Sequence, residues 1–324
     1  MPRVRLTSRT PLRLVLPFAM VVLASCAGSD QPTSTQTEPA VTTTTPELRA
    51  TVVVTYSVLG RLVSDLVGSA AEVVVIIPDG RDPHDYQPSA RDMETLSDAD
   101  LIVANGLGFE EYLEDSIGAA ADAGTPVFKL SEHVTVRDAN NGTDDGHGDD
   151  HDGATDDTHG AGDPHLWLSP ATMLEALPAL ADAVAAAISI DIEPAALTAQ
   201  LEALDTDLAA QFAALDGCKL VTGHDELGYF ADRYGCEVIG AIVPSMTTTA
   251  DASAKQLAEL KEVMAEHDAT TMFTSLGTPQ NVAEQIARET GADVVELGTH
   301  ALGVHASYAA FIQSIADAIL DALR

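Results

Sequence analysis

Short runs of β-branched residues alternate with Ala-rich amphipathic stretches from about residue 50 to the end of the chain. Apolar residues at spacings of three and four predict a helix, and short runs rich in Val and Ile predict a strand. In the first half the predicted strands and helices are, in order, Thr51–Thr55, Val58–Val67, Glu72–Ile77, Ala90–Ser97, Leu101–Ala104, Glu110–Ala123 and Pro126–Leu130. This order favours a parallel sheet with helices on both faces, so the predicted fold class is α/β.

Two long helical stretches follow, Pro170–Ser189 and Pro194–Leu215. The second has no helix breaker and would extend ~33 Å at 1.5 Å per residue, long enough to connect two lobes. Alternation then resumes with Lys219–Thr222, Leu227–Tyr234, Glu237–Ile239, Ala252–Glu266, Thr271–Thr274, Pro279–Glu289, Val294–Leu297 and a last helix from Tyr308. We therefore predict two α/β lobes, residues 48–192 and 217–324, each with a parallel sheet flanked by helices, joined by a long rigid helix at 193–216.

The amino terminus has the pattern of a bacterial lipoprotein signal. Four arginines within the first 13 residues precede an apolar stretch, Leu14–Ala24, and small residues lead to Cys26. Residues 1–25 are predicted to be removed and Cys26 to be lipidated, which would anchor an extracytoplasmic protein to the cell membrane. A plain signal peptide or an uncleaved anchor is the alternative. Residues 26–47, rich in Ser, Thr and Pro, are predicted to form a flexible tether.

The chain is strongly acidic: 16 Lys and Arg oppose 50 Asp and Glu, a formal net charge of −34. Nucleic acids and anionic lipid surfaces attract basic proteins, so neither is an expected partner. An acidic field instead concentrates cations. We expect a monomer that acts on a cation outside the cytoplasm.

Two cysteines remain besides Cys26. Cys218 and Cys236 each stand at the start of a predicted strand, so neighbouring parallel strands would bring them together. Outside the cytoplasm, such a pair predicts a disulfide. Two buried, unpaired thiols are the alternative.

A segment rich in Asp, Gly and His, residues 138–163, interrupts the first lobe. His147, His151 and His159 lie there among many aspartates, and this composition cannot build a core. Imidazole and carboxylate together suit Zn²⁺, so these histidines are predicted to bind metal weakly, as an auxiliary site. The alternative is an acidic insert that merely contains histidines.

Four further histidines recur in similar positions. His84, His224 and His300 each follow a predicted strand, and His165 stands where the chain leaves the acidic segment. Ligands of open α/β sheets bind at the carboxyl ends of the strands. Two histidines from each lobe would thus meet in the cleft between the lobes, where four nitrogens can enclose a tetrahedral Zn²⁺ ion. A single histidine in a loop is weak evidence for a metal site. The prediction depends on four histidines that occupy similar positions in one chain.

Four motifs carry a resemblance to a known family: GRDPHDYQP at 80–88, NGLGFE at 105–110, DPHLWLSP at 163–170 and TGHDELGYF at 222–230. They resemble the metal-binding receptors of bacterial zinc and manganese ABC importers, and the zinc branch in particular. The resemblance implies a two-lobed receptor with a rigid linking helix, which binds one metal ion and delivers it to a membrane permease. It also implies that His84, His165 and His224 are ligands, and three histidines favour Zn²⁺ over Mn²⁺.

The fourth ligand departs from the family pattern. The family has an Asp in a segment like Leu-Asp-Pro-Leu-Gly, whereas this chain reads Thr-His-Ala-Leu-Gly at 299–303, with His300 in the Asp position. Either His300 replaces the carboxylate, or Glu296, His305 or water completes the site. Asp85, Asp225 and Glu226 are candidates to orient the ligands, and Trp167 is either core or a cover over His165.

Three classes of function remain. A zinc receptor needs a closed, reversible site, and its transported ion would be Zn²⁺ rather than Mn²⁺. A manganese receptor of the same family, a surface adhesin or a metal-buffering lipoprotein is the alternative. A zinc hydrolase needs an open coordination position and a general base, and the chain has no His-Glu-x-x-His run, so no enzyme activity is expected.

Overall fold

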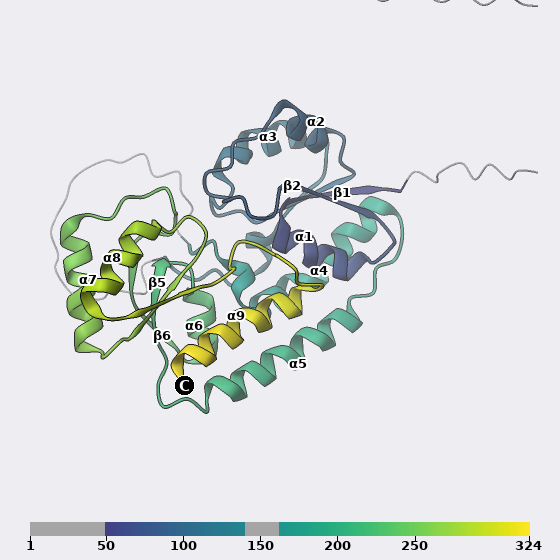
Figure 1. Ribbon diagram of the computed structural model, residues 1–324. Helices are drawn as coiled ribbons and strands as arrows, with labels where there is room; N and C mark the ends of the chain where they lie inside the picture. Colours follow the sequence, from purple (N-terminus) through teal and green to yellow (C-terminus); the bar gives the residue numbers. More distant parts are fainter. Residues whose placement is uncertain (1–48, 140–161) are drawn as a thin grey trace, which may run out of the picture. The chain divides into compact units, whose positions relative to one another are not determined.

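The computed structural model describes residues 49–139 and 162–324. These belong to one compact unit, Leu48–Arg324 (Figure 1). The predicted signal, the tether with Cys26, and the histidines His147, His151 and His159 all lie outside the described residues.

The first sheet has four parallel strands in the order β2-β1-β3-β4. The strands are β1 (Thr51–Tyr56), β2 (Glu72–Ile77), β3 (Leu101–Ala104) and β4 (Val127–Lys129). The valines of β1 are fully buried, because helices α1 (Ser57–Val67) and α4 (Pro170–Ile188) pack against this sheet. Burial on both faces explains why the strand reads as a continuous apolar run.

The second sheet repeats this arrangement in the order β6-β5-β7-β8, again parallel. Its strands are β5 (Lys219–His224), β6 (Glu237–Val243), β7 (Thr271–Thr274) and β8 (Asp293–Glu296). Helices α7 (Ala254–Glu266) and α8 (Gln280–Thr290) cover it and enclose a separate small apolar core. The predicted α/β class with two parallel sheets is therefore confirmed.

Helices α4, α5 (Ala195–Phe212) and α9 (Tyr308–Leu323) form a layer shared by the two lobes. Helix α5 contacts α4, α9 and the short helix α6 (Gly228–Tyr234), and α5 and α9 lie side by side in Figure 1. One apolar core runs from β1 through these helices to residues of β5 and β7. Helix α4 is long and apolar enough to cross a membrane, but it packs against α5, β3 and the segment after His165.

Most predicted boundaries differ from the observed ones by one to four residues. Helix α5 ends at Phe212 and is shorter than predicted, because the chain turns at residues 213–216 before it enters β5. Strand β5 continues through His224, so this histidine belongs to the strand and not to the turn after it. The remaining helices of the described residues are α2 (Ala90–Ser97), α3 (Glu111–Asp122) and two 3₁₀ turns, η1 (Leu130–His133) and η2 (Leu166–Leu168).

A disulfide joins Cys218 to Cys236 at the starts of β5 and β6. The two strands pair in parallel, and the pairing begins with Lys219 opposite Glu237. The residues just before the strands, Cys218 and Cys236, are therefore neighbours. The bond fixes the amino end of β5, whose carboxyl end carries His224.

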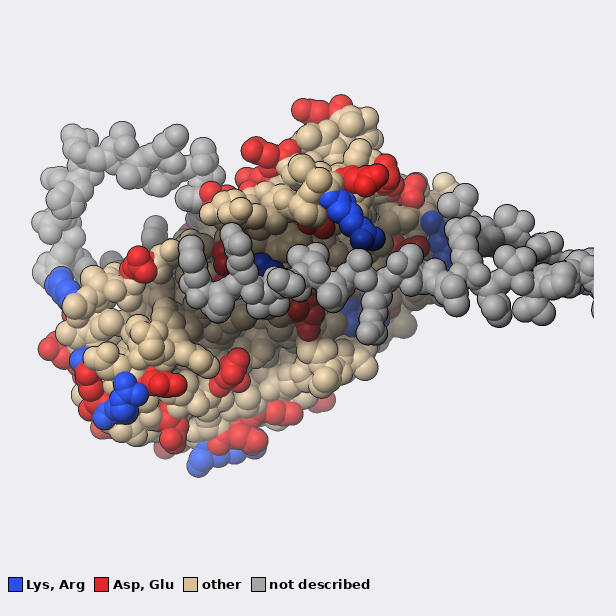
Figure 2. Space-filling view, turned by 45° about the horizontal axis from the view of Figure 1, so that its top comes forward, with Lys and Arg blue, Asp and Glu red and all other residues tan. Residues whose placement is uncertain are grey.

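Strand order reverses between β1 and β3 in the first sheet and between β5 and β7 in the second. Such reversals open a crevice at the carboxyl ends of the strands, where α/β proteins bind ligands. Acidic side chains are scattered over the face of the molecule that Figure 2 shows, with few basic ones among them. This agrees with the formal charge of −34.

Candidate metal centre

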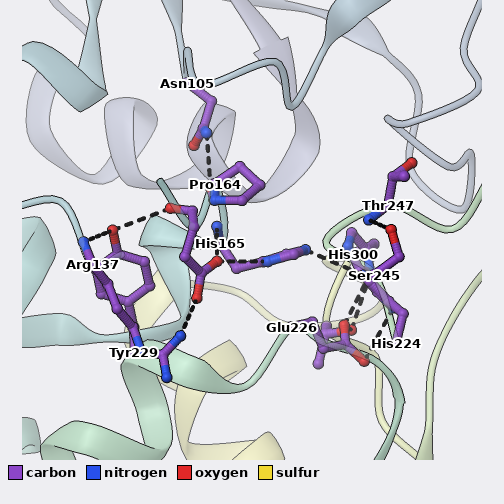
Figure 3. Close-up of polar contacts among 12 residues, drawn as sticks. Asn105, Arg137, Pro164, His165, His224, Glu226, Tyr229, Ser245, Thr247 and His300 are labelled. Carbon is purple, nitrogen blue, oxygen red and sulfur yellow. Dashed lines mark hydrogen bonds and ion pairs between the residues drawn. The ribbon is translucent and has the colours of Figure 1, made fainter. Parts of the chain in front are cut away.

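Four histidines meet in the crevice: His84, His165, His224 and His300. Each offers one ring nitrogen, and these four nitrogens all lie within 4.8 Å of one another. The six distances between ring centres span only 5.1 to 5.9 Å, so the rings surround a common point. All four side chains are buried, at 5% exposure or less. Figure 3 shows His165, His224 and His300 converging.

The ends of strands position three of them. His84 lies in the loop between β2 and α2, His224 is the last residue of β5, and His300 lies in the loop after β8. His165 immediately precedes the 3₁₀ turn η2. His84 and His165 thus come from the part of the chain with the first sheet, and His224 and His300 from the part with the second.

The repeated tripeptide Asp-Pro-His has a local structure that orients two of the rings. Asp82 accepts a hydrogen bond at 3.0 Å from the backbone N–H of His84, and Asp163 accepts one at 3.0 Å from that of His165. An aspartate that binds the backbone two residues ahead forms a tight turn, and the intervening proline restricts its φ. Both tripeptides lie in motifs that the sequence marked, at 80–88 and 163–170, but no role was predicted for their aspartates.

Asp163 also fixes the ring of His165. Its Oδ1 lies 2.8 Å from Nδ1 of His165, an arrangement that directs Nε2 towards the other histidines. The guanidinium of Arg137 contacts the other oxygen of Asp163 at 3.4 Å and Asp232 of α6 at 2.8 Å (Figure 3). Tyr229 of α6 donates to the carbonyl of Asp163 at 3.1 Å. These contacts tie the segment before His165 to the second lobe.

Glu226 lies behind the rings of His224 and His300. Its carboxylate oxygens are 3.7 Å from Nδ1 of His224 and 3.5 Å from Nδ1 of His300. Thr299 donates to the same carboxylate at 2.6 Å and lies 3.1 Å from Nδ1 of His300, so it links the two groups. Of the three candidates to orient the ligands, Glu226 alone touches them in this structure: Asp85 is exposed, and the backbone N–H of Asp225 donates to the carbonyl of Ser245.

Three ring nitrogens of the four histidines have no hydrogen-bond partner: Nε2 of His84, Nδ1 of His224 and Nε2 of His300. Burying an unpaired polar atom is costly, and such an atom in a native site points to a missing ligand. Burial lowers the pKa of His84 to about 3, and the neighbouring His165 makes a smaller contribution in the same direction. Burial likewise lowers the pKa of His224 and of His300 well below 6.5. Neutral imidazoles are the form that binds metal.

Aromatic rings close the other side of the cluster. Phe109 lies 4.9 Å from His84 between ring centres, and Trp167 lies 5.5 Å from both His165 and His300. Trp167 is buried, and its indole N–H donates to the carbonyl of Thr299 at 2.8 Å. Trp167 therefore belongs to the core and also covers His165, so both of the roles considered from the sequence apply.

The motif at 105–110 surrounds the same site. Asn105 donates through Nδ2 to the carbonyl of Pro164 at 2.8 Å, next to His165 (Figure 3). Glu110, also buried, accepts from the backbone N–H of Asn105 at 2.6 Å. The sequence identified this motif without a role for its side chains; a buried Asn between a strand and a glycine was the available signal.

The loops of His84 and His300 are joined directly. Asp79 accepts hydrogen bonds from the backbone N–H groups of Leu302 at 2.5 Å and Gly303 at 2.9 Å. Of the other two residues considered for the fourth position, Glu296 is exposed and His305 lies 3.1 Å from the hydroxyl of Ser314. Neither belongs to the cluster.

Comparisons with known proteins agree with this site. The family model described as zinc-uptake complex component A, periplasmic, matches residues 52–322. A Treponema pallidum protein described as metal-binding is 32% identical over 255 residues, 76% of this chain and 78% of that protein. The manganese-binding lipoprotein MntA of Halalkalibacterium halodurans is 22% identical over 301 residues, 90% of each. The crystal structure of ZnuA aligns with a TM-score of 0.69 at 25% identity, covering 85% of this chain and 100% of that one.

The expected resemblance to zinc and manganese receptors is thus confirmed. Because the family model covers both sheets and all four buried histidines, the chain belongs to the periplasmic zinc-uptake complex component A family.

Proposed function

We propose that this chain is the extracytoplasmic receptor of a zinc importer, which binds one Zn²⁺ ion and passes it to an ABC permease. The ligands are His84, His165, His224 and His300. One observation carries the proposal: four buried imidazoles place a nitrogen each within 4.8 Å of the others, and three of these histidines have a ring nitrogen without a hydrogen-bond partner.

The donor set favours zinc over manganese. Imidazole nitrogen suits Zn²⁺, whereas Mn²⁺ prefers carboxylate and other oxygen ligands. In the described residues the cluster consists of four histidines and no carboxylate. The manganese-binding relative is thus the weaker guide to the ion that this chain carries.

Four protein ligands also suit a carrier better than a catalyst. Catalytic zinc sites keep one position open for water or substrate, whereas a closed site holds the ion. Delivery then requires the cluster to open, and its ligands come in pairs from the two lobes. The lipid anchor at Cys26 and weak zinc binding by His147, His151 and His159 are further parts of this proposal.

Calorimetric titration of the metal-free mature chain tests the proposal. We expect one tight Zn²⁺ site, weaker binding of Mn²⁺, and marked loss of zinc affinity in His300→Ala. The matched control is His305→Ala, which changes a histidine of the same loop outside the cluster. Absence of a tight zinc site, or tighter binding of Mn²⁺, would contradict the proposed function. A tight zinc site whose affinity does not change in His300→Ala would mean that another group is the fourth ligand.

A further inference from the structure

We propose that Glu226 supplies the negative charge that balances a divalent ion in the four-histidine cluster, and so makes the site prefer divalent over monovalent cations. This inference rests on the proposed function. It assigns selectivity by charge to a residue that does not itself touch the ion.

The position of Glu226 allows it to act on two ligands at once. Its side chain is 1% exposed, and its two oxygens face Nδ1 of His224 and Nδ1 of His300 at 3.7 and 3.5 Å. A proton on each Nδ1 leaves the Nε2 lone pair free to bind the ion. A carboxylate beside Nδ1 favours that arrangement and makes the imidazole a stronger donor.

Among the described residues the carboxylate of Glu226 has no fixed cationic partner, unlike that of Asp163. Asp163 also touches a ligand, but Arg137 lies 3.4 Å from it and offsets its charge. Within 49–139 and 162–324, no Lys or Arg forms an ion pair with Glu226. The hydroxyl of Thr299, which donates to this carboxylate, carries no charge. The cation that would complete a buried ion pair with Glu226 is therefore the one held by the histidines.

This chain has His300 where the resemblance to the family implies a carboxylate ligand, so a negative charge near the ion must come from another residue. Four neutral imidazoles leave the full charge of the ion in a buried site, and burying unbalanced charge is expensive. The Coulomb energy between a carboxylate and an ion scales with the charge of the ion. The stabilisation by Glu226 should thus be about twice as large for a dication as for a monocation in the same position.

The test compares Zn²⁺ with Ag⁺, a monovalent ion that also binds imidazole, in nitrate buffer free of chloride. Affinities are measured by competition with chelators for the wild type, Glu226→Gln and Asp205→Asn. The last is the matched control, since Asp205 is a buried carboxylate of α5 whose partners are Arg233 and Tyr234 and not a histidine. In Glu226→Gln we expect zinc affinity to fall about 10- to 100-fold, and silver affinity to fall by about the square root of that factor. Asp205→Asn should change neither.

Equal losses for the two ions would mean that Glu226 only positions the rings, and no loss would mean that it has no role; either result overturns the proposal. Glu226→Asp keeps the charge and should retain the wild-type preference for Zn²⁺, even if Glu226→Gln does not fold. A changed preference in that variant would also overturn it. Failure of the wild type to bind zinc tightly would instead refute the proposed function, and this inference with it.

Discussion

The Nε2 atoms of His165 and His224 lie 3.2 Å apart, although the two residues are 59 positions apart in the chain. Two nitrogens at roughly 2.0–2.1 Å from a tetrahedral zinc ion are about 3.3 Å from each other. This pair, with one ring from each lobe, already has the spacing of two ligands on one ion. The relationship ties metal binding to the contact between the lobes.

Cobalt substitution should report this geometry directly. Co²⁺ bound in place of Zn²⁺ is expected to show the intense visible absorption of tetrahedral coordination, because the four rings surround one point. Replacing His224 with Ala should weaken that absorption, since more than one water would enter the space of the ring and raise the coordination number. A weak spectrum typical of six-coordinate cobalt in the wild type would contradict the four-histidine arrangement.

Asp163→Asn should weaken zinc binding by about 10- to 100-fold, the usual cost of losing a group that orients a ligand. The amide can no longer hold Nδ1 of His165 as an anionic acceptor at 2.8 Å. Competition with a chelator measures the change. Asp138→Asn is the control, because Asp138 is exposed and forms a β-bridge with Gly162, the residue before Asp163. Similar losses in the two variants would show that the effect is not specific to the ligand.

Much of this fold could be predicted from local patterns. Strands Glu72–Ile77, Leu101–Ala104 and Thr271–Thr274 have the predicted boundaries, because β-branched runs bounded by turn residues are a local signal. The approach of His84, His224 and His300 to one another also followed from local information. Parallel strands place their carboxyl ends at one edge, so histidines at the ends of these strands arrive at the same crevice. His165 follows no strand, and the resemblance to the family indicated it.

The groups that orient these histidines could not be predicted in the same way. Arg137 reaches Asp232 across 95 positions of the chain, and Trp167 reaches the carbonyl of Thr299 across 132. Such contacts depend on how the lobes pack, and no periodicity records them. Adjacency to a ligand in the sequence did not identify these groups reliably. It suggested Asp85, which is exposed, and left out Asp163, which touches His165.

Tyr229→Phe should destabilise the protein by about 1–3 kcal/mol, the usual cost of leaving buried polar groups unpaired. Its hydroxyl accepts from the backbone N–H of Arg137 at 2.9 Å and donates to the carbonyl of Asp163 at 3.1 Å. Denaturant unfolding of the metal-free protein measures the loss. Tyr112→Phe, at a tyrosine that is 45% exposed, should have little effect. If both variants unfold at the wild-type midpoint, Tyr229 does not hold the lobes in the way described.

Glu110→Gln should remove a specific pH dependence from the stability of the metal-free protein. Burial raises the pKa of Glu110 to about 7, although the backbone N–H of Asn105 opposes the rise. Between the ordinary value of 4.5 and about 7, the folded protein binds a proton that the unfolded chain has lost, so the free energy of unfolding falls as pH rises through this window. From pH 5 to pH 8 the wild type should lose about 2 to 3 kcal/mol more than the Gln variant. Denaturant unfolding at the two pH values measures the difference. Glu111→Gln is the same change at an exposed neighbour, and its free energy of unfolding should change with pH as that of the wild type does. A Glu110→Gln profile that also ran parallel to that of the wild type would mean that Glu110 is ionised in the folded protein at little cost.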